Sequence, residues 1–280
     1  MIHLKSIALV TRYWKPLEDW IGHITRVLED SVEDGDIVVI SDKAISTATG
    51  SIFNERGTVP SFTAKVLAKY WMRYIWTYFL APLCHLSEMT IQHIREYPIV
   101  EGSVHKQVVL QYAGFLQALL HSSEGGIDSS NLPYSYVSIP LKKTNQIAED
   151  VHQQIISKLD KNVIVMIADT DKTYSWRNFH FTPRPGTIEE IHSVGGILSY
   201  LIGRVLRLRK RATPLAIAGS KISVEEALNI ADLADQSRGL GAGKTVWDMA
   251  ETFKVSLNGV SWEMLEGIKH MPVTIVRRRC

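Results

Sequence analysis

An apolar run followed by acidic residues marks the first place where this chain could do chemistry. In VIVMIADTDKTYSWRN, residues 163–178, we expect an apolar strand to end at Asp169, Thr170 and Asp171. The carboxyl edge of a mixed sheet is where reactive groups commonly lie. Paired carboxylates there would suit Mg²⁺ or Mn²⁺ holding nucleotide phosphates. The structural alternative is an ordinary turn and helix-capping sequence.

A second cluster lies in the turn sequence GGIDSSNLP, residues 125–133, which leads toward another strand-like segment. Asp128 and Asn131 there could offer oxygen ligands to a hard cation.

The third stretch is EDGDIVVISDKAISTATGS, residues 33–51, in which a turn leads into a buried strand. This strand would carry Ser41, Asp42 and Lys43 to its end, where Lys43 could meet a phosphate as a point charge. A lysine in this position can equally be a solvated surface residue.

The segment GLGAGKT, residues 239–245, has the appearance of a phosphate-binding loop but lacks its spacing. Such a loop needs four residues between the glycines and a strand before them. Only three residues separate Gly239 from Gly243, and the preceding stretch has helical periodicity. We therefore expect glycines to end a helix and Lys244 and Thr245 to open the next one. A kinase-like enzyme that uses Lys244 is the alternative.

Composition narrows the possible partners. With 280 residues and 45% hydrophobic content the chain can build a substantial core, and a net charge of +2 gives no general reason to expect nucleic acid or a membrane. Two cysteines, Cys84 and Cys280, favour a reducing cytoplasm. The first ten residues read as a strand and not as a signal peptide.

An aromatic stretch at Tyr70–Leu86 is interrupted by Arg73 and Pro82 and is too short to span a bilayer, which needs about 20 apolar residues. A buried helix or a subunit interface is the favoured interpretation. The basic run Gly203–Arg211 is interpreted as the cationic last turns of a helix.

Helical and extended patterns alternate without internal repeats, which predicts a mixed α/β (α+β) fold with mixed sheets and flanking helices. We expect one unit over residues 1–280, with a division into two lobes near 180–190 as an alternative. Strands are expected at 2–10, 37–41, 134–139, 163–168, 215–218 and 273–276. Helices are expected at 17–32, 61–78, 146–159 with Thr144 or Asn145 as cap, 195–208, 224–236 and 246–253. The stretch FHFTPRPG, residues 179–186, is expected to be irregular.

Taken in order, these segments resemble a γ-glutamyl ligase family that adds glutamate to the lactyl-phosphate tail of the deazaflavin coenzyme F420, using GTP and a divalent metal. The resemblance covers nearly the whole chain, from about residue 2 to residue 276. It is carried by EDGDIVVISDKAISTATGSI, VPSFTAKVLAKYW, GIDSSNLP and VIVMIADTDKTYSWRN. These are similar to the family's Asp-Gly-Asp strand with Ser-x-Lys, its Pro-Ser-x-x-Ala helix start, its Gly-Val-Asp-x-Ser-Asn turn and its apolar strand ending in Ser-Asp-Thr.

The resemblance implies a set of site residues and a reaction. The family's metal-binding positions match Asp128, Asp169 and, more distantly, Glu189. Its positions near the nucleotide and substrate phosphates match Ser41, Lys43, Thr170 and Arg177. Of these, Lys43 and Arg177 would act in catalysis. The implied reaction is phosphoryl transfer from GTP to the carboxylate of a phospholactyl-type acid, followed by attack of the amine of L-glutamate on the acyl phosphate. A homodimer is also implied, with the aromatic helix at 70–79 as a candidate interface.

The chain departs from the family pattern around the implied site. Asp42 replaces a small or amide residue, and FHFTPRP inserts about seven residues before Gly186. In place of the family's His-Gly-rich segment this chain has GFLQALLHSSEGG, and in place of its Gly-Val-Ala-Gly stretch it has SVGG. These departures keep a second hypothesis open: a diverged, non-catalytic homologue that binds a nucleotide or another small molecule in a regulatory or structural role.

Overall fold

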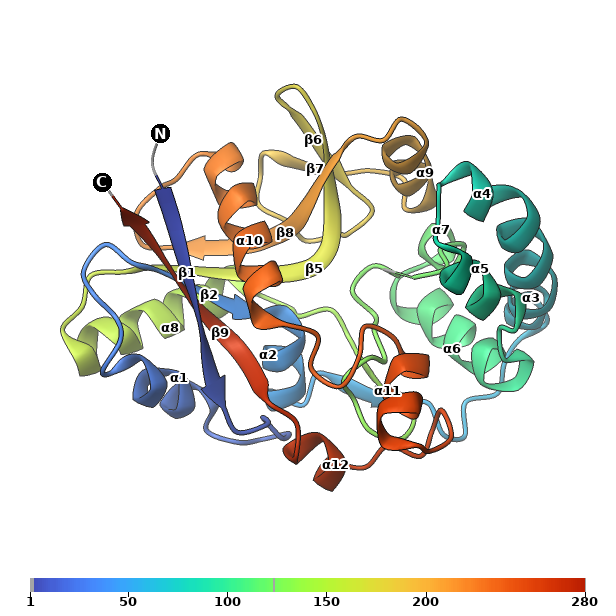
Figure 1. Ribbon diagram of the computed structural model, residues 1–280, viewed down its shortest axis with the longest axis horizontal. Coiled ribbons are helices and arrows are strands. Elements are labelled where there is room, and N and C mark those ends of the chain that lie inside the picture. The colour runs from blue at the N-terminus through green and yellow to red at the C-terminus, as the bar shows by residue number, and fades with distance from the viewer. Residues whose placement is uncertain (1–2, 123, 280) are drawn as a thin grey trace.

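A mixed sheet forms the centre of the molecule, as the computed structural model shows for residues 3–122 and 124–279 (Figure 1). Within these residues the sheet has seven strands in the order β1-β9-β2-β5-β6-β7, with β8 also paired to β5. The strands are β1 (His3–Thr11), β2 (Ile37–Ser41), β5 (Ile164–Trp176), β6 (Phe179–Thr182), β7 (Ile191–Ser193), β8 (Arg209–Ala218) and β9 (His270–Arg279). A separate pair joins β3 (Ile52–Asn54) to β4 (Tyr136–Ser138). The mixed α/β fold is therefore confirmed.

The central strands are apolar on both faces because helices cover both. Val38 and Ile40 of β2 pack with one set of helices, and Ile37 and Val39 pack with α10 on the other side. The helices on the first face are α1 (Trp20–Leu28), α2 (Asp42–Ala48) and α8 (Thr144–Leu159); α10 spans Val224–Arg238. Continuous apolar runs of this kind are typical of parallel strands buried on both faces, and β2 and β5 do run parallel.

A group of short helices lies beside the sheet, on the right of Figure 1. Its members are α3 (Phe62–Val66), the π-helical η1 (Leu67–Leu80), α4 (Ala81–Leu83), α5 (Glu88–Arg95), α6 (Ile99–Tyr112) and α7 (Phe115–Ala118). The remaining helices are α9 (Ile197–Val205), α11 (Val246–Phe253) and α12 (Trp262–Glu266). Neither the single unit nor the division near residues 180–190 is tested by this arrangement, and both stay predictions.

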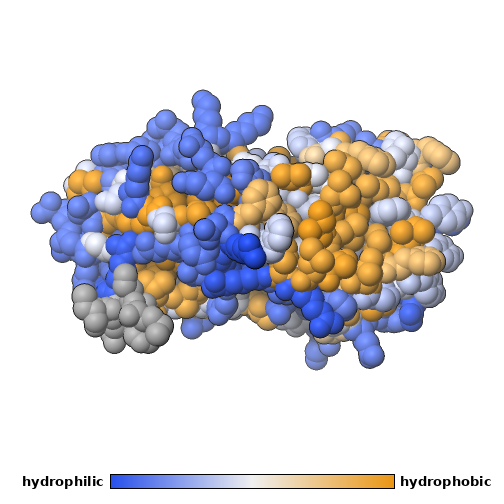
Figure 2. Space-filling view, turned by 90° about the horizontal axis from the view of Figure 1, so that it is seen from above, coloured by the Kyte–Doolittle hydropathy of each residue, from blue (hydrophilic) through white to orange (hydrophobic). Residues whose placement is uncertain are grey.

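On the face that Figure 2 shows, apolar side chains gather on the right. Exposed apolar residues of η1, α4, α9 and the residue after α9 include Phe79, Leu83, Leu198, Ile202 and Leu206. On η1, Tyr70, Tyr74 and Tyr78 stack in a row with ring centroids 6.3 and 6.4 Å apart. The helix at this position is thus partly exposed and not fully buried. In the part of the chain that the structure describes, no helix combines the length and apolar character needed to cross a bilayer.

Several elements differ from the sequence-based expectation. The apolar strand at 163–168 does not end at Asp169: β5 continues to Trp176, because after the parallel pairing with β2 ends at Ala168 its other edge stays bonded to β8. The expected strand at 2–10 corresponds to β1, except for residue 2, which lies outside the described residues. The start of FHFTPRPG is not irregular, since residues 179–182 form β6 on β5.

Two helix-end assignments differ from the prediction. Gly203 to Val205 do form the last turn of α9, with Arg204 as its basic residue, but Arg209 to Arg211 open β8. The residue before α8 is Lys143, in left-handed backbone and without a side-chain capping bond, so neither Thr144 nor Asn145 is the cap. The start of β8 follows from its pairing with β5, which local patterns do not contain.

Candidate functional site

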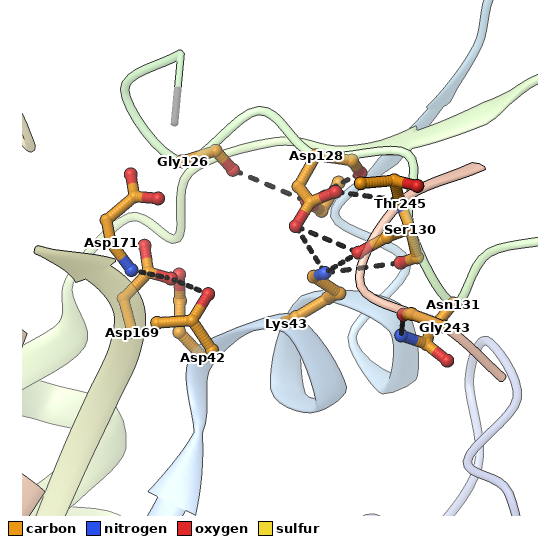
Figure 3. A network of polar contacts seen from close by, with 12 residues as sticks. Asp42, Lys43, Gly126, Asp128, Ser130, Asn131, Asp169, Asp171, Gly243 and Thr245 are labelled. Carbon is orange, nitrogen blue, oxygen red and sulfur yellow. Dashed lines mark hydrogen bonds and ion pairs between the residues drawn. The ribbon is translucent and has the colours of Figure 1, made fainter. Parts of the chain in front are cut away.

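The site forms where β2 and β5 deliver polar residues to the same edge of the sheet. The parallel register places Ser41 beside Ala168, so Asp42 and Lys43, at the start of α2, lie next to Asp169 (Figure 3). At Asp169 the pairing of β5 with β8 shifts register between Asp169 and Lys172. This irregularity makes room for side chains that a regular strand would direct into its neighbours.

Lys43 contacts the turn that carries Asp128. Its Nζ donates to the Asp128 carboxylate, to Ser130 Oγ at 2.7 Å and to the Ser130 carbonyl at 3.2 Å. The other carboxylate oxygen of Asp128 accepts the Ser130 N–H at 2.7 Å. Lys43 and Asp128 keep 21% and 39% of their side-chain surface exposed. This pair, whose contacts Figure 3 shows, is therefore open to solvent and to a ligand by its exposed fraction.

Arg184 forms a second and much more buried contact set. Its Nε donates to Asp169 Oδ2 at 2.6 Å and its Nη2 donates to Asp42 Oδ2 at 2.8 Å. Its Nη1 donates to the Gly125 carbonyl at 2.8 Å and to the Pro185 carbonyl at 3.3 Å. One guanidinium thus joins the start of α2, the irregular part of β5 and the turn before Asp128.

Burial and charge act in opposite directions on these carboxyls. Burial raises the pKa of Asp42 to about 6, although Arg184 partly offsets this effect. Burial would also raise the pKa of Asp169, but the Arg184 guanidinium outweighs it and holds that pKa below its usual value. The same two carboxylates raise the pKa of Arg184 against the effect of its burial. Arg184 is accordingly a permanent cation here.

A pocket of about 140 Å³ opens beside this pair of contact sets. Its lining includes Ser41, Lys43, Asp169, Thr170, Arg238 and the Gly239–Gly241 segment. Four of the residues that the resemblance implied therefore surround one pocket. Arg238 lies at the end of α10 and is a buried cation that the sequence analysis did not single out.

The GLGAGKT segment borders this pocket without being a phosphate-binding loop of the strand-to-helix kind. Helix α10 enters it and α11 leaves it, with Thr245 as a side-chain cap in a capping box, as predicted. Asn131 holds the loop: its Oδ1 accepts the Ala242 N–H at 2.7 Å and its Nδ2 donates to the Gly243 carbonyl at 2.9 Å. Lys244 is exposed and is not part of the pocket lining.

Two of the implied site residues lie elsewhere. Arg177 is exposed in the turn between β5 and β6, eight positions after Asp169 on a strand that rises about 3.3 Å per residue. Glu189 is exposed in the segment between β6 and β7. Neither lines the pocket, so the assignment of Arg177 to catalysis and Glu189 to metal binding stays a prediction without geometric support.

The fit of a divalent ion differs between the two aspartates. Across residues 3–122 and 124–279, no group of three or more His, Cys, Asp or Glu side chains could hold a metal ion. The half-exposed carboxylate of Asp128 could reach an ion brought by a ligand. The carboxylate of Asp169 is 11% exposed and is held by Arg184, which does not suit a metal ligand.

Sequence reasoning missed Asp42 and Arg184 as a pair. The resemblance gave a signal, because it implied that Asp42 replaces a small or amide residue and that FHFTPRP, which contains Arg184, is an insertion. Two such differences with opposite charge are a reason to ask whether the residues meet. They lie 142 positions apart in the sequence, so local patterns do not reveal the contact.

Comparison with known proteins agrees with the resemblance. The family model described as F420-0:gamma-glutamyl ligase matches residues 9–237. An uncharacterized protein of Methanocaldococcus jannaschii is 34% identical over 287 residues, which cover 98% of this chain and 96% of that protein. The chain belongs to the F420-0:gamma-glutamyl ligase family.

Proposed function

We propose that the chain is a GTP-dependent ligase that joins L-glutamate to F420-0 or to a related phospholactyl-type acid. Membership of the family supports amide formation of the γ-glutamyl ligase type. The observation that carries the proposal for this chain is Lys43, which lines the pocket where the pairing of β2 with β5 ends and is open to solvent. A lysine that can leave one carboxylate for a phosphate is suited to bind a nucleotide.

The residues around the pocket supply binding and orientation. Lys43 would turn from Asp128 to the phosphates, and the hydroxyls of Ser41 and Thr170 would add hydrogen bonds. The Gly239–Gly241 segment has no bulky side chain at two of its three positions, which lets a ligand approach its backbone. No side-chain nucleophile is needed.

The proposed reaction has two steps. The acid carboxylate attacks the γ-phosphorus of GTP, which gives an acyl phosphate and GDP. The amine of L-glutamate then attacks the acyl carbon, an amide bond forms, inorganic phosphate leaves and the amine loses a proton. Positioning and cationic side chains carry most of the catalysis in such transfers.

Mg²⁺ or Mn²⁺ is proposed to accompany the triphosphate and to neutralise charge on its oxygens. In this chain Asp128 is the carboxylate that suits such an ion, because Lys43 would release it on turning to the phosphates. A cytoplasmic location and a homodimer are also proposed; the exposed apolar residues of η1 and α9 support a surface that a second copy covers.

The alternative is a non-catalytic homologue that binds a nucleotide or another small molecule. The buried contacts of Arg184 favour this alternative, because they bind Asp169, one of the residues implied to hold the metal. It predicts ligand binding without turnover.

Isothermal titration with GTP, GDP and ATP in Mg²⁺ or Mn²⁺ tests the proposal. We expect wild type to bind a guanine nucleotide and Lys43→Met to weaken binding at least about tenfold, since it removes the charge from the pocket. Lys244→Met is the matched control and should bind as wild type does, because Lys244 does not line the pocket. Continued GDP formation that requires both the acid and L-glutamate, with amide product, supports the ligase; binding without turnover supports the alternative. No nucleotide binding with either metal would overturn the ligase proposal and the nucleotide-binding form of the alternative.

A further inference from the structure

Arg184 takes a position that a metal ion would need. Its Nε lies 2.6 Å from Asp169 Oδ2. A Mg²⁺ or Mn²⁺ ion on that oxygen would lie at about 2.0–2.2 Å, and in the direction from which Nε donates it would overlap the guanidinium. The other oxygen of Asp169 accepts the Asp171 N–H at 3.3 Å. Both oxygens of this carboxylate therefore have donors from the chain itself.

The guanidinium is fixed from several directions. Besides the two aspartates, the Gly125 and Pro185 carbonyls accept from it. Gly126 leaves space for it, since a Cβ at that position would lie 2.3 Å from Arg184 Cζ. The side chains of Arg184 and Asp42 are only 3% and 6% exposed. Moving the arginine aside would leave buried charges without partners, which is strongly unfavourable.

The partner of Arg184 supports the same conclusion. Asp42 accepts from Nη2 of Arg184 at 2.8 Å, and both side chains are buried. An uncharged residue at position 42 would offer the guanidinium no carboxylate. Asp42 and Arg184 thus form one buried ion pair, in which each charge needs the other.

We infer that Arg184 is a built-in cation that replaces a divalent ion at Asp169, with Asp42 as the residue that positions it. Asp169 is then a partner of Arg184 and not a metal ligand, and a divalent ion that enters with a nucleotide is bound through Asp128. Arg184 is a positioning residue, because its donors are directed to the chain and not into the pocket. This inference does not rest on the proposed reaction.

Mn²⁺ binding without nucleotide tests the inference on the full chain, by isothermal titration and by the electron paramagnetic resonance signal of free Mn²⁺. Wild type and Asp169→Asn should bind Mn²⁺ equally. The double variant Asp42→Asn/Arg184→Gln removes the buried pair and should bind Mn²⁺ at least about tenfold more tightly than wild type, because a carboxylate is released from its cation. Adding Asp169→Asn to the double variant should abolish the gain.

Two results would overturn the inference. One is wild-type Mn²⁺ binding that Asp169→Asn weakens tenfold or more, which would mean that the ion displaces Arg184. The other is a folded double variant, verified by circular dichroism, that gains no Mn²⁺ affinity. Should the double variant fail to fold, the comparison of wild type with Asp169→Asn decides the matter alone. If Arg184 only stabilised the fold, its removal would not raise the affinity for Mn²⁺.

Discussion

Two cation–carboxylate contacts lie within one site and differ in burial. Lys43 and Asp128 are 21% and 39% exposed, whereas Arg184 and Asp42 are 3% and 6% exposed. Water screens the first pair, so Lys43 can exchange its carboxylate for a phosphate at small cost. The second pair cannot exchange partners in this way, because a single buried charge is costly. Burial therefore separates the cation that can bind a ligand from the cation that holds the site together.

The largest expected effect is on stability after loss of the buried cation. Arg184→Gln leaves two buried carboxylates without a cation and should lower the free energy of unfolding by about 3–5 kcal/mol. Lys43→Gln removes the exposed pair and should cost less than about 1 kcal/mol. Urea unfolding of both variants measures the difference. Equal losses would mean that burial does not distinguish the two contacts.

A second buried network, next to the turn that Arg184 contacts, extends the comparison to acid stability. Glu124 accepts from Lys106 and from His105 at 2.6 Å, and His105 also contacts Glu55 at 2.8 Å. Burial alone would raise the pKa of Glu124, but Lys106 and His105 lower it to about 2. Since the pKa in the folded state lies below the unfolded value of 4.5, this stabilisation is present above pH 4.5 and is lost as pH falls toward 2.

Glu124→Gln removes this titration. Wild type should lose on the order of 2 kcal/mol more than the variant as pH falls from about 5 to about 2, measured by urea unfolding at each pH. Glu190→Gln, on an exposed turn, serves as the control and should follow the wild-type curve. Parallel curves for wild type and Glu124→Gln would show that the buried network does not set acid stability.

The smallest effect tests how rigidly Arg184 is held. Gly126 and Gly35 both have left-handed backbone, with φ of +90° and +81°. A Cβ at Gly35 would meet no atom within 4 Å, whereas one at Gly126 would meet the Arg184 guanidinium. Gly35→Ala should therefore cost only backbone strain, about 1 kcal/mol. Gly126→Ala should cost about 1–2 kcal/mol more, measured by thermal unfolding, and an equal cost would indicate a mobile guanidinium.

Much of the fold followed from local patterns. The strand at residues 37–41 and the helix at 246–253 have the predicted bounds, because a continuous apolar run and a capped amphipathic segment are readable over a few residues. The helices at 42–48 and 99–112 were missed. The first directly follows a strand, and the second has little separation of polar and apolar faces.

The candidate site was predictable only in part. Ser41, Lys43, Asp169 and Thr170 do line one pocket, since β2 and β5 run parallel and their pairing ends at Ser41 and Ala168. Arg177 and Glu189 do not line it, because β5 continues past Asp169 and carries Arg177 away. The direction in which a strand continues is decided by its neighbour β8, which is distant in sequence.

The sequence by itself determined the class of fold, the buried central strands, the family resemblance and the helix-to-helix nature of the GLGAGKT segment. These properties rest on periodicity, capping residues and motif order, all of which neighbouring residues encode. Only the tertiary structure decided that Arg184 meets both Asp42 and Asp169. An ion pair depends on the distance and burial of side chains, and Arg184 and Asp42, 142 positions apart, can meet only when the chain between them has folded.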